Sequence, residues 1–163
     1  MSQNLELFAF LKAVRRLSRA LDMHSSRINR ESGLTLPQLI VLTCIRDLGQ
    51  VTSRAISIAA DLSAPTVVGI LDNLEAKGLI ERYRSETDRR IVHTRLTDRG
   101  RHLLEEAPSP MGDAFEARFM ALGEDQRRAL LSALMTTAEM VGSDEAANAR
   151  NGQTVSQGVA GPS

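Results

Sequence analysis

The sequence has little cysteine, few aromatic residues and no tryptophan. Its 163 residues include one cysteine, Cys44, and one tyrosine, Tyr83, and aromatic residues make up 3% of the chain. A single cysteine cannot form an internal disulfide, which fits a reducing compartment such as the cytoplasm. So few aromatic rings argue against a site that stacks on sugars or on the bases of single-stranded nucleic acid.

Membrane-targeting features and an excess of charge of either sign are also missing. No apolar run approaches the roughly 18 residues that a membrane span needs, and residues 1–10 lack the basic stretch that begins a signal peptide. Lysine and arginine together number 20, as do aspartate and glutamate, so the formal net charge is zero. We therefore expect a cytoplasmic protein of about single-domain size and not a uniformly basic nucleic-acid binder.

The neutral total hides an uneven distribution of charge. Residues 82–101 contain seven arginines against three acidic residues, and residues 1–30 are also net positive, whereas residues 103–163 are net negative. A basic island in a neutral chain can be the footprint of a nucleic-acid interface, although a solvated charged hairpin gives the same pattern. Arginine supplies 18 of the 20 basic residues, which suits groove contacts but also follows from the codon bias of a GC-rich genome.

Motifs for catalysis or for metal binding are missing as well. The sequence has no Gly-x-Ser-x-Gly, no phosphate-cradling glycine loop and no His-x-Glu. Its three histidines, His24, His93 and His102, do not lie at metal-ligand spacing from one another or from Cys44. We therefore expect neither an enzyme nor a metal or cofactor site.

The two ends of the chain are predicted to be helical, followed by a tail. Apolar residues recur at three- and four-residue steps over 4–30, which predicts a long amphipathic helix that ends at Gly33. A helix of this length at the start of a small protein often packs on a partner. Helical patterns return at 111–121 and 124–141. Residues 142–163 have no apolar period, so a disordered tail is expected there.

The middle of the chain alternates short helices with two strand-like runs. Residues that suit helix N-caps stand at four places: Thr35, Ser53, Ser63 and Thr97. They predict helices that end at Gly49, at residue 60, at residue 77 and at residue 106. Strands are expected at 79–84 and 90–96, around a hairpin tip at 85–89. This order is that of a winged helix-turn-helix, a mainly α fold with a small β-hairpin wing.

The helix at 64–77 has the pattern of a recognition helix. Its buried stripe is predicted to consist of Val67, Ile70, Leu71 and Leu74. The outward face then consists of small apolar and polar residues: Ala64, Pro65, Thr66, Val68, Gly69 and Asn73. Such a face suits thymine methyl groups in a major groove about 12 Å wide. Gly69 costs roughly 1 kcal/mol against alanine and fits close approach to DNA, or alternatively to a neighbouring helix.

Six short segments follow one another in a fixed order between residues 35 and 100. They are TLPQL (35–39), IA (58–59), LSAPTV (62–67), LDNLEAKGLIER (71–82), DRR (88–90) and LTDRG (96–100). Together they resemble the MarR family of bacterial transcriptional regulators, at motif level over 35–104. The resemblance implies a homodimeric DNA-binding repressor, with dimerisation helices at 1–34 and 105–141 around a winged domain at 35–104.

The resemblance also implies how such a dimer contacts DNA. Two copies of helix 64–77 read the half-sites of a pseudo-palindrome, and the wing at 82–96 enters the minor groove. The family's wing arginine corresponds to Arg90, oriented by Asp88, or alternatively to Arg89. Ser63 and Thr66 are expected to donate to phosphate. Three further arginines are expected at phosphates: Arg54, Arg82 and Arg84. Relatives often carry Lys, Arg or Gln near positions 64, 68 and 69. Here these positions are Ala64, Val68 and Gly69, so less direct hydrogen-bond readout of bases is expected.

Effector binding is implied by the same resemblance. Many relatives bind small, often anionic aromatic molecules between the dimerisation helices and the winged domain. In this sequence, that crevice would be lined from Leu11, Arg15, His24, Ile40 and Cys44. The segments 84–90 and 34–38 are also similar to relatives that control genes for compatible solutes such as ectoine.

Two other functions remain open from the sequence. One is redox sensing through Cys44, although its place in an apolar helical run favours a buried, inert thiol. The other is a winged helix that binds a protein instead of DNA. A protein-binding module has no need for seven arginines between residues 82 and 101, so the charge of the wing favours DNA binding over protein binding.

Overall fold

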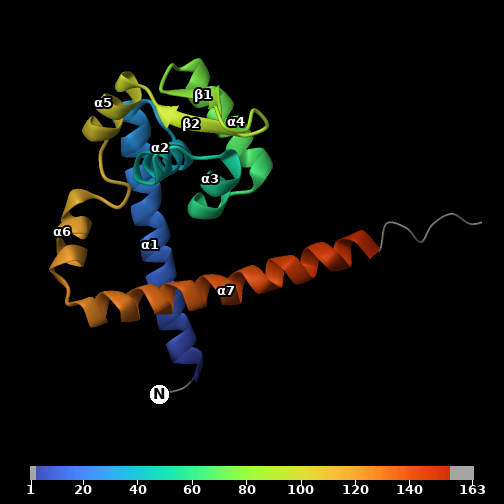
Figure 1. Ribbon diagram of the computed structural model, residues 1–163. Helices are drawn as coiled ribbons and strands as arrows, with labels where there is room; N and C mark the ends of the chain where they lie inside the picture. Colours follow the sequence, from blue (N-terminus) through green and yellow to red (C-terminus); the bar gives the residue numbers. More distant parts are fainter. Residues whose placement is uncertain (1–2, 155–163) are drawn as a thin grey trace, which may run out of the picture. The chain divides into compact units, whose positions relative to one another are not determined.

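The computed structural model describes the backbone of residues 3–154 and the side chains of residues 4–141. Its elements are α1 (Gln3–Ser32), α2 (Leu36–Leu48), α3 (Ser53–Ala60), α4 (Ala64–Ala76), β1 (Ile80–Arg84), β2 (Val92–Leu96), α5 (Asp98–Glu106), α6 (Asp113–Ala121) and α7 (Glu124–Thr154) (Figure 1). The chain divides after Glu116 into two compact units. The predicted fold class, mainly helical with one small hairpin, is confirmed.

Side-chain caps explain where the helices of the first unit begin. The Thr35 hydroxyl accepts a hydrogen bond from the Gln38 N–H, and the Gln38 side chain accepts one from the Thr35 N–H. This reciprocal pair is a capping box. Ser63 and Thr97 cap α4 and α5 as predicted. Three of the four predicted caps are therefore confirmed.

The predicted cap of α3 is wrong by one residue. Thr52, not Ser53, is the N-cap, and its hydroxyl accepts from the N–H of Ala55. Ser53 is consequently the first residue inside the helix. Both residues have side chains that can cap, so the local sequence does not distinguish them.

The last helix is longer than the sequence pattern indicates. A disordered tail was expected from residue 142, but α7 continues to Thr154. That expectation is wrong over 142–154, because residues 144–150 read Asp-Glu-Ala-Ala-Asn-Ala-Arg and include several strong helix formers. Backbone propensity therefore extends the helix after the apolar period has ended. The rest of the expected tail, 155–163, lies outside the described residues.

The core of the first unit lies where α2, α3, α4 and the hairpin meet (Figure 1). Of the stripe predicted on α4, Val67, Leu71 and Leu74 are fully buried and Ile70 is half-buried. β1 and β2 pair antiparallel, from Ile80 opposite Leu96 to residue 84 opposite residue 92. With one face of α4 committed to the core, the other face is presented to solvent.

Candidate nucleic-acid interface

The turn between α3 and α4 sets the two helices at a steep angle. The helices are inclined by 111°, within the usual range for a helix-turn-helix. Asp61 takes a left-handed conformation with φ of 51°, which Asp adopts more readily than most residues. The Ser57 hydroxyl donates to the Leu62 carbonyl, and the Leu62 N–H donates to the Ser57 carbonyl. These bonds fix α4 relative to α3.

The outward face of α4 is exposed, as predicted from its pattern. The six residues assigned to it are all exposed: Ala64, Pro65, Thr66, Val68, Gly69 and Asn73. A Cβ added at Gly69 would meet nothing within 4 Å. No helix of the described residues therefore lies against Gly69, which removes the packing explanation within that part of the chain and leaves close approach by an outside partner.

A pair of hydroxyls lies at the start of α4. Ser63 Oγ and Thr66 Oγ1 are 2.7 Å apart, and the Thr66 N–H also donates to Ser63 Oγ. Only one hydroxyl hydrogen is used between the two oxygens. The other hydroxyl keeps its hydrogen for an acceptor outside the protein, so the pair can offer one donor to a phosphate at this helix N-terminus.

Gln38, which was not expected in the site from the sequence, holds the side chain of Asn73. Gln38 is buried, and its Nε2 donates to Asn73 Oδ1 over 2.8 Å. The side-chain oxygen of Asn73 thus accepts a hydrogen bond inside the protein, and its side-chain N–H groups remain for an acceptor outside it. The spacing Thr35-x-x-Gln38 could have identified the capping box, but not the contact with α4, which depends on how the two helices pack.

The structure corrects the expected role of Arg82. This arginine forms ion pairs with Asp72 and Glu75 on α4, and its side chain is only 26% exposed. Its charge is therefore compensated by two carboxylates of the same unit. Arg82 attaches the wing to α4 and is not retained as a phosphate contact.

The tip of the wing is held by its own backbone contacts. Asp88 Oδ1 accepts from the backbone N–H of Arg90 at 2.9 Å. Asp88 thus holds the main chain at Arg90, and its expected role in orienting the side chain of a wing arginine stays a prediction. Arg84 Nη1 donates to the carbonyl of Arg89 at 3.3 Å. The side chains of Arg89 and Arg90 are exposed and form no hydrogen bond or ion pair with the described residues.

Besides Arg82, two arginines of the basic island are ion-paired within the described residues. Arg95 pairs with Glu81, and Arg101 pairs with Asp98. The hydrogen bond from Arg101 lowers the pKa of the Asp98 carboxyl. Arg54 on α3 is exposed and, within the part of the chain described, unpaired. The basic island of the sequence is therefore partly neutralised, at Arg82, Arg95 and Arg101, and uncompensated at Arg89 and Arg90 where the wing projects.

The residues expected to line an effector crevice do not converge within the chain. Leu11 and His24 stand 13 positions apart on α1, which separates them by about 20 Å along a helix. Arg15 lines one hollow with other α1 cations, and His24 lines another. The His24 ring instead lies against Gly112, where an added Cβ would come within 2.5 Å of it. One chain by itself therefore does not bring Leu11, Arg15 and His24 into one hollow, and the expected crevice stays a prediction.

Cys44 is half-buried on α2, and burial raises the pKa of its thiol, with the nearby Asp47 carboxylate adding to the effect. A raised pKa means that less thiolate, the reactive form, is present at neutral pH. We expect iodoacetamide to alkylate Cys44 more slowly in the native protein than in the same protein unfolded in guanidinium, from pH 7 to 9. Mass spectrometry measures both rates. Faster reaction of the native protein would instead indicate an activated thiol.

Metal and membrane sites find no support in the described part of the chain. No group of three or more His, Cys, Asp or Glu side chains lies close enough there to bind a metal ion. No single described helix is long and apolar enough to cross a membrane, and the bent α3–α4 pair reaches that measure only when its two helices are counted together.

Comparison with known proteins finds similarity to transcriptional regulators. Residues 34–92 match the model of the MarR family. The HTH-type transcriptional regulator MgrA of Staphylococcus aureus is 34% identical over 92 residues, which cover 56% of this chain and 60% of MgrA. The chain thus matches about 60% of the length of this curated relative.

Two solved structures have a similar fold. One describes the regulation of DNA binding of Bordetella bronchiseptica BpsR by 6-hydroxynicotinic acid. It is 28% identical, with a TM-score of 0.57, over 78% of this chain and 98% of that one. The other is reduced AbfR bound to DNA, which is 25% identical, with a TM-score of 0.60, over 86% of this chain and 99% of that one.

Proposed function

Because residues 34–92 match the MarR family model, we propose that the chain is a homodimeric, sequence-specific DNA-binding regulator of transcription of this family. The outward face of α4 enters the major groove, and the wing tip enters the adjacent minor groove. The observation that carries this proposal is the pair of uncompensated arginines, Arg89 and Arg90, on the same unit as an unobstructed α4 face. A narrow minor groove attracts such arginines through its enhanced negative potential.

The proposed DNA contacts are of two kinds, those to base edges and those to phosphates. Val68 and the methyl groups of Ala64 and Thr66 suit thymine methyls, and Asn73 donates to a base-edge acceptor. Ser63, Arg54 and Arg84 contact phosphates and set the register without reading sequence. This interface has few base-reading hydrogen bonds, so a large share of its specificity comes from the shape of the minor groove at the wing.

Dimerisation is supported by an apolar stripe on α1 that the chain itself leaves exposed. Leu7 is 59% exposed, Phe10 45% and Leu17 44%, and these residues recur at helical spacing. Large apolar side chains on α7 are similarly exposed: Leu130, Leu131, Leu134, Met135 and Met140. A second copy is the occupant we propose for both surfaces, because two-fold DNA sites require a two-fold protein.

The mode of regulation is part of the same proposal. The dimer acts as a repressor in the cytoplasm, and a small molecule releases it from its operator. The regulation of BpsR by 6-hydroxynicotinic acid supports an effector of this general kind. Genes for compatible solutes are the proposed targets, on the similarity of segments 84–90 and 34–38 alone.

The experiment that tests the proposal is fluorescence-anisotropy titration of the DNA upstream of the protein's own gene, against a shuffled duplex, across a salt series. We expect tight binding to the upstream DNA only, with one dimer per site and affinity that falls steeply with salt. Equal, weak binding to both duplexes would favour the winged helix as a protein-binding module.

Arg90→Ala is expected to weaken binding to that DNA by about 1–2 kcal/mol, or roughly 5- to 30-fold, because one groove-inserted guanidinium is lost. The matched control is Arg95→Ala, which removes the same charge from the wing. Arg95 is paired with Glu81, so its loss should change the affinity by less than about threefold. Equal effects of the two substitutions would show that only the net charge of the wing matters.

A further inference from the structure

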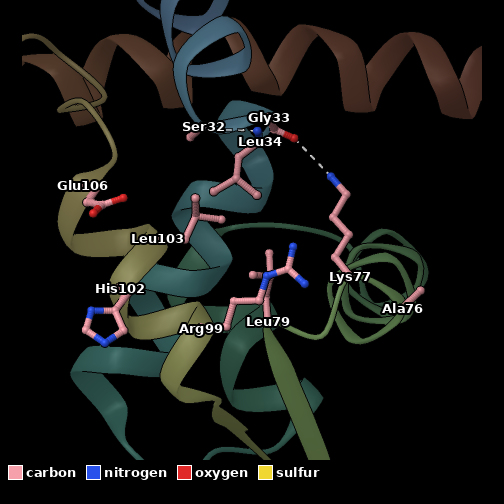
Figure 2. Close-up of a pocket in the computed structure, with 10 residues that line it drawn as sticks. All are labelled: Ser32, Gly33, Leu34, Ala76, Lys77, Leu79, Arg99, His102, Leu103 and Glu106. Carbon is pink, nitrogen blue, oxygen red and sulfur yellow. Dashed lines mark hydrogen bonds between the residues drawn. The ribbon is translucent and has the colours of Figure 1, made fainter.

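A cleft with a volume of about 730 Å³ lies in the first unit, away from the proposed DNA contacts. The end of α1, the end of α4, the start of β1 and one side of α5 enclose it (Figure 2). Ten residues line it: Ser32, Gly33, Leu34, Ala76, Lys77, Leu79, Arg99, His102, Leu103 and Glu106. None of them belongs to the effector crevice expected from the sequence. The volume falls within the usual range for small-molecule sites.

The floor of the cleft is aliphatic. Leu34 and Leu79 belong to the core with 0% and 2% exposure, and Leu103 packs against that core while remaining partly accessible. No phenylalanine, tyrosine or tryptophan is among the lining residues, and their one ring is the His102 imidazole. Leu34 and Leu79 are covered by other protein atoms, so an apolar group bound here would contact the accessible part of Leu103, which favours a compact aliphatic body over one that needs ring stacking.

The rim of the cleft is mostly cationic. Arg99 is exposed and forms no hydrogen bond or ion pair with any described residue, unlike Arg82, Arg95 and Arg101 in the same basic island. Its guanidinium projects between Lys77 and the leucine floor (Figure 2). Glu106 is the one carboxylate in the lining. A guanidinium with no internal partner beside apolar surface suits a carboxylate that carries an aliphatic group.

We propose that this cleft binds a small aliphatic carboxylate, with its carboxylate on Arg99 and Lys77 and its chain on Leu103. Binding would also affect α4, because Lys77 Nζ donates to the Gly33 carbonyl over 3.1 Å (Figure 2). That bond joins the end of α1 to the end of α4. A carboxylate that competes for Lys77 weakens this link, and its regulatory meaning rests on the proposed DNA-binding function.

The binding test titrates hexanoate, as the probe, into the full-length protein without DNA. Isothermal titration calorimetry measures the binding. Hexan-1-ol and hexylammonium have the same apolar body with a neutral or a positive head. Hexanoate is expected to bind, and Arg99→Gln to weaken it about tenfold. Arg99→Lys keeps the charge but loses the planar guanidinium, so it should weaken binding by less than Arg99→Gln does. Arg46→Gln is the matched control, because Arg46 lies outside the cleft and pairs with Asp47.

Three results would overturn the proposal: no heat with hexanoate, equal affinity for all three probes, or unchanged affinity in a folded Arg99→Gln variant. Circular dichroism checks the fold of each variant. The same samples are then titrated with upstream DNA, with and without hexanoate. Hexanoate is expected to change the DNA affinity, and DNA the hexanoate affinity, because binding linkage is reciprocal. Lys77→Gln removes the bond to the Gly33 carbonyl, so it should reduce that change.

The two titrations separate the cleft from the proposed function. If DNA binds specifically while hexanoate does not bind, the cleft proposal fails and the regulator stands. If hexanoate binds through Arg99 and specific DNA binding is absent, the site stands and the proposed function fails. If both bind without influencing each other, the regulatory coupling through Lys77 is wrong.

Discussion

Leu17→Glu is expected to convert the proposed dimer into monomers. Leu17 lies in the middle of the apolar stripe on α1 and is 44% exposed in the single chain, so the substitution leaves the fold of one copy intact. In a two-fold interface the change occurs twice. Each copy loses the burial of one leucine and gains an unpaired carboxylate in an apolar contact, at a cost of about 3 kcal/mol. The total, about 6 kcal/mol, exceeds what a micromolar dimer can absorb while staying associated.

Sedimentation equilibrium measures this outcome directly. The unmodified protein is expected at twice 17.8 kDa and the variant at 17.8 kDa, with unchanged helical content by circular dichroism. Ala9→Glu is the matched control, because Ala9 is exposed on the side of α1 away from the stripe. It should leave the mass unchanged. A dimeric Leu17→Glu variant would show that the α1 stripe is not the interface.

Gly100→Ala is expected to lower the free energy of unfolding by about 3 kcal/mol. Gly100 lies in the first turn of α5, and a Cβ there would stand 2.0 Å from the Leu79 carbonyl oxygen. The clashing atom belongs to the backbone of Leu79, and hydrogen bonds hold both Leu79 and Gly100 in place. The Leu79 carbonyl accepts from the Thr97 N–H, and the Gly100 N–H donates to the Thr97 hydroxyl. The clash can be relieved only by moving α5 away from β1.

Gly69→Ala supplies the control for that experiment, because it makes the same chemical change in another helix. A Cβ at Gly69 meets nothing within 4 Å, so this variant should gain up to about 1 kcal/mol from the better helix propensity of alanine. Urea denaturation of both variants at one fixed protein concentration gives the comparison, since dimerisation makes stability concentration-dependent. Stabilisation of both variants would show that α5 tolerates displacement from β1.

Local patterns in the sequence determined the order and type of nearly all the elements. The periodic apolar residues of α4, the cap residues Thr35, Ser63 and Thr97, and the glycine after α1 act over one or two helical turns, so their effects can be predicted from neighbouring letters. The same periodicity placed the exposed face of α4. Where two residues could serve equally well, as at Thr52 and Ser53, or where helix propensity continued past the apolar period, the boundaries were wrong.

The pairing of charged and polar groups was decided by tertiary structure. Arg82 and Arg90 are both arginines of the same basic segment, and the sequence pattern does not distinguish their roles. Packing of the hairpin on α4 gives Arg82 two carboxylates and leaves Arg90 with none. Gln38 meets Asn73 across 35 positions of sequence. The sequence by itself thus determined a winged helix-turn-helix with an arginine-rich wing, because helix and strand patterns are local. Only the tertiary structure decided which arginines remain free, because compensation depends on distances between residues that the sequence does not place side by side.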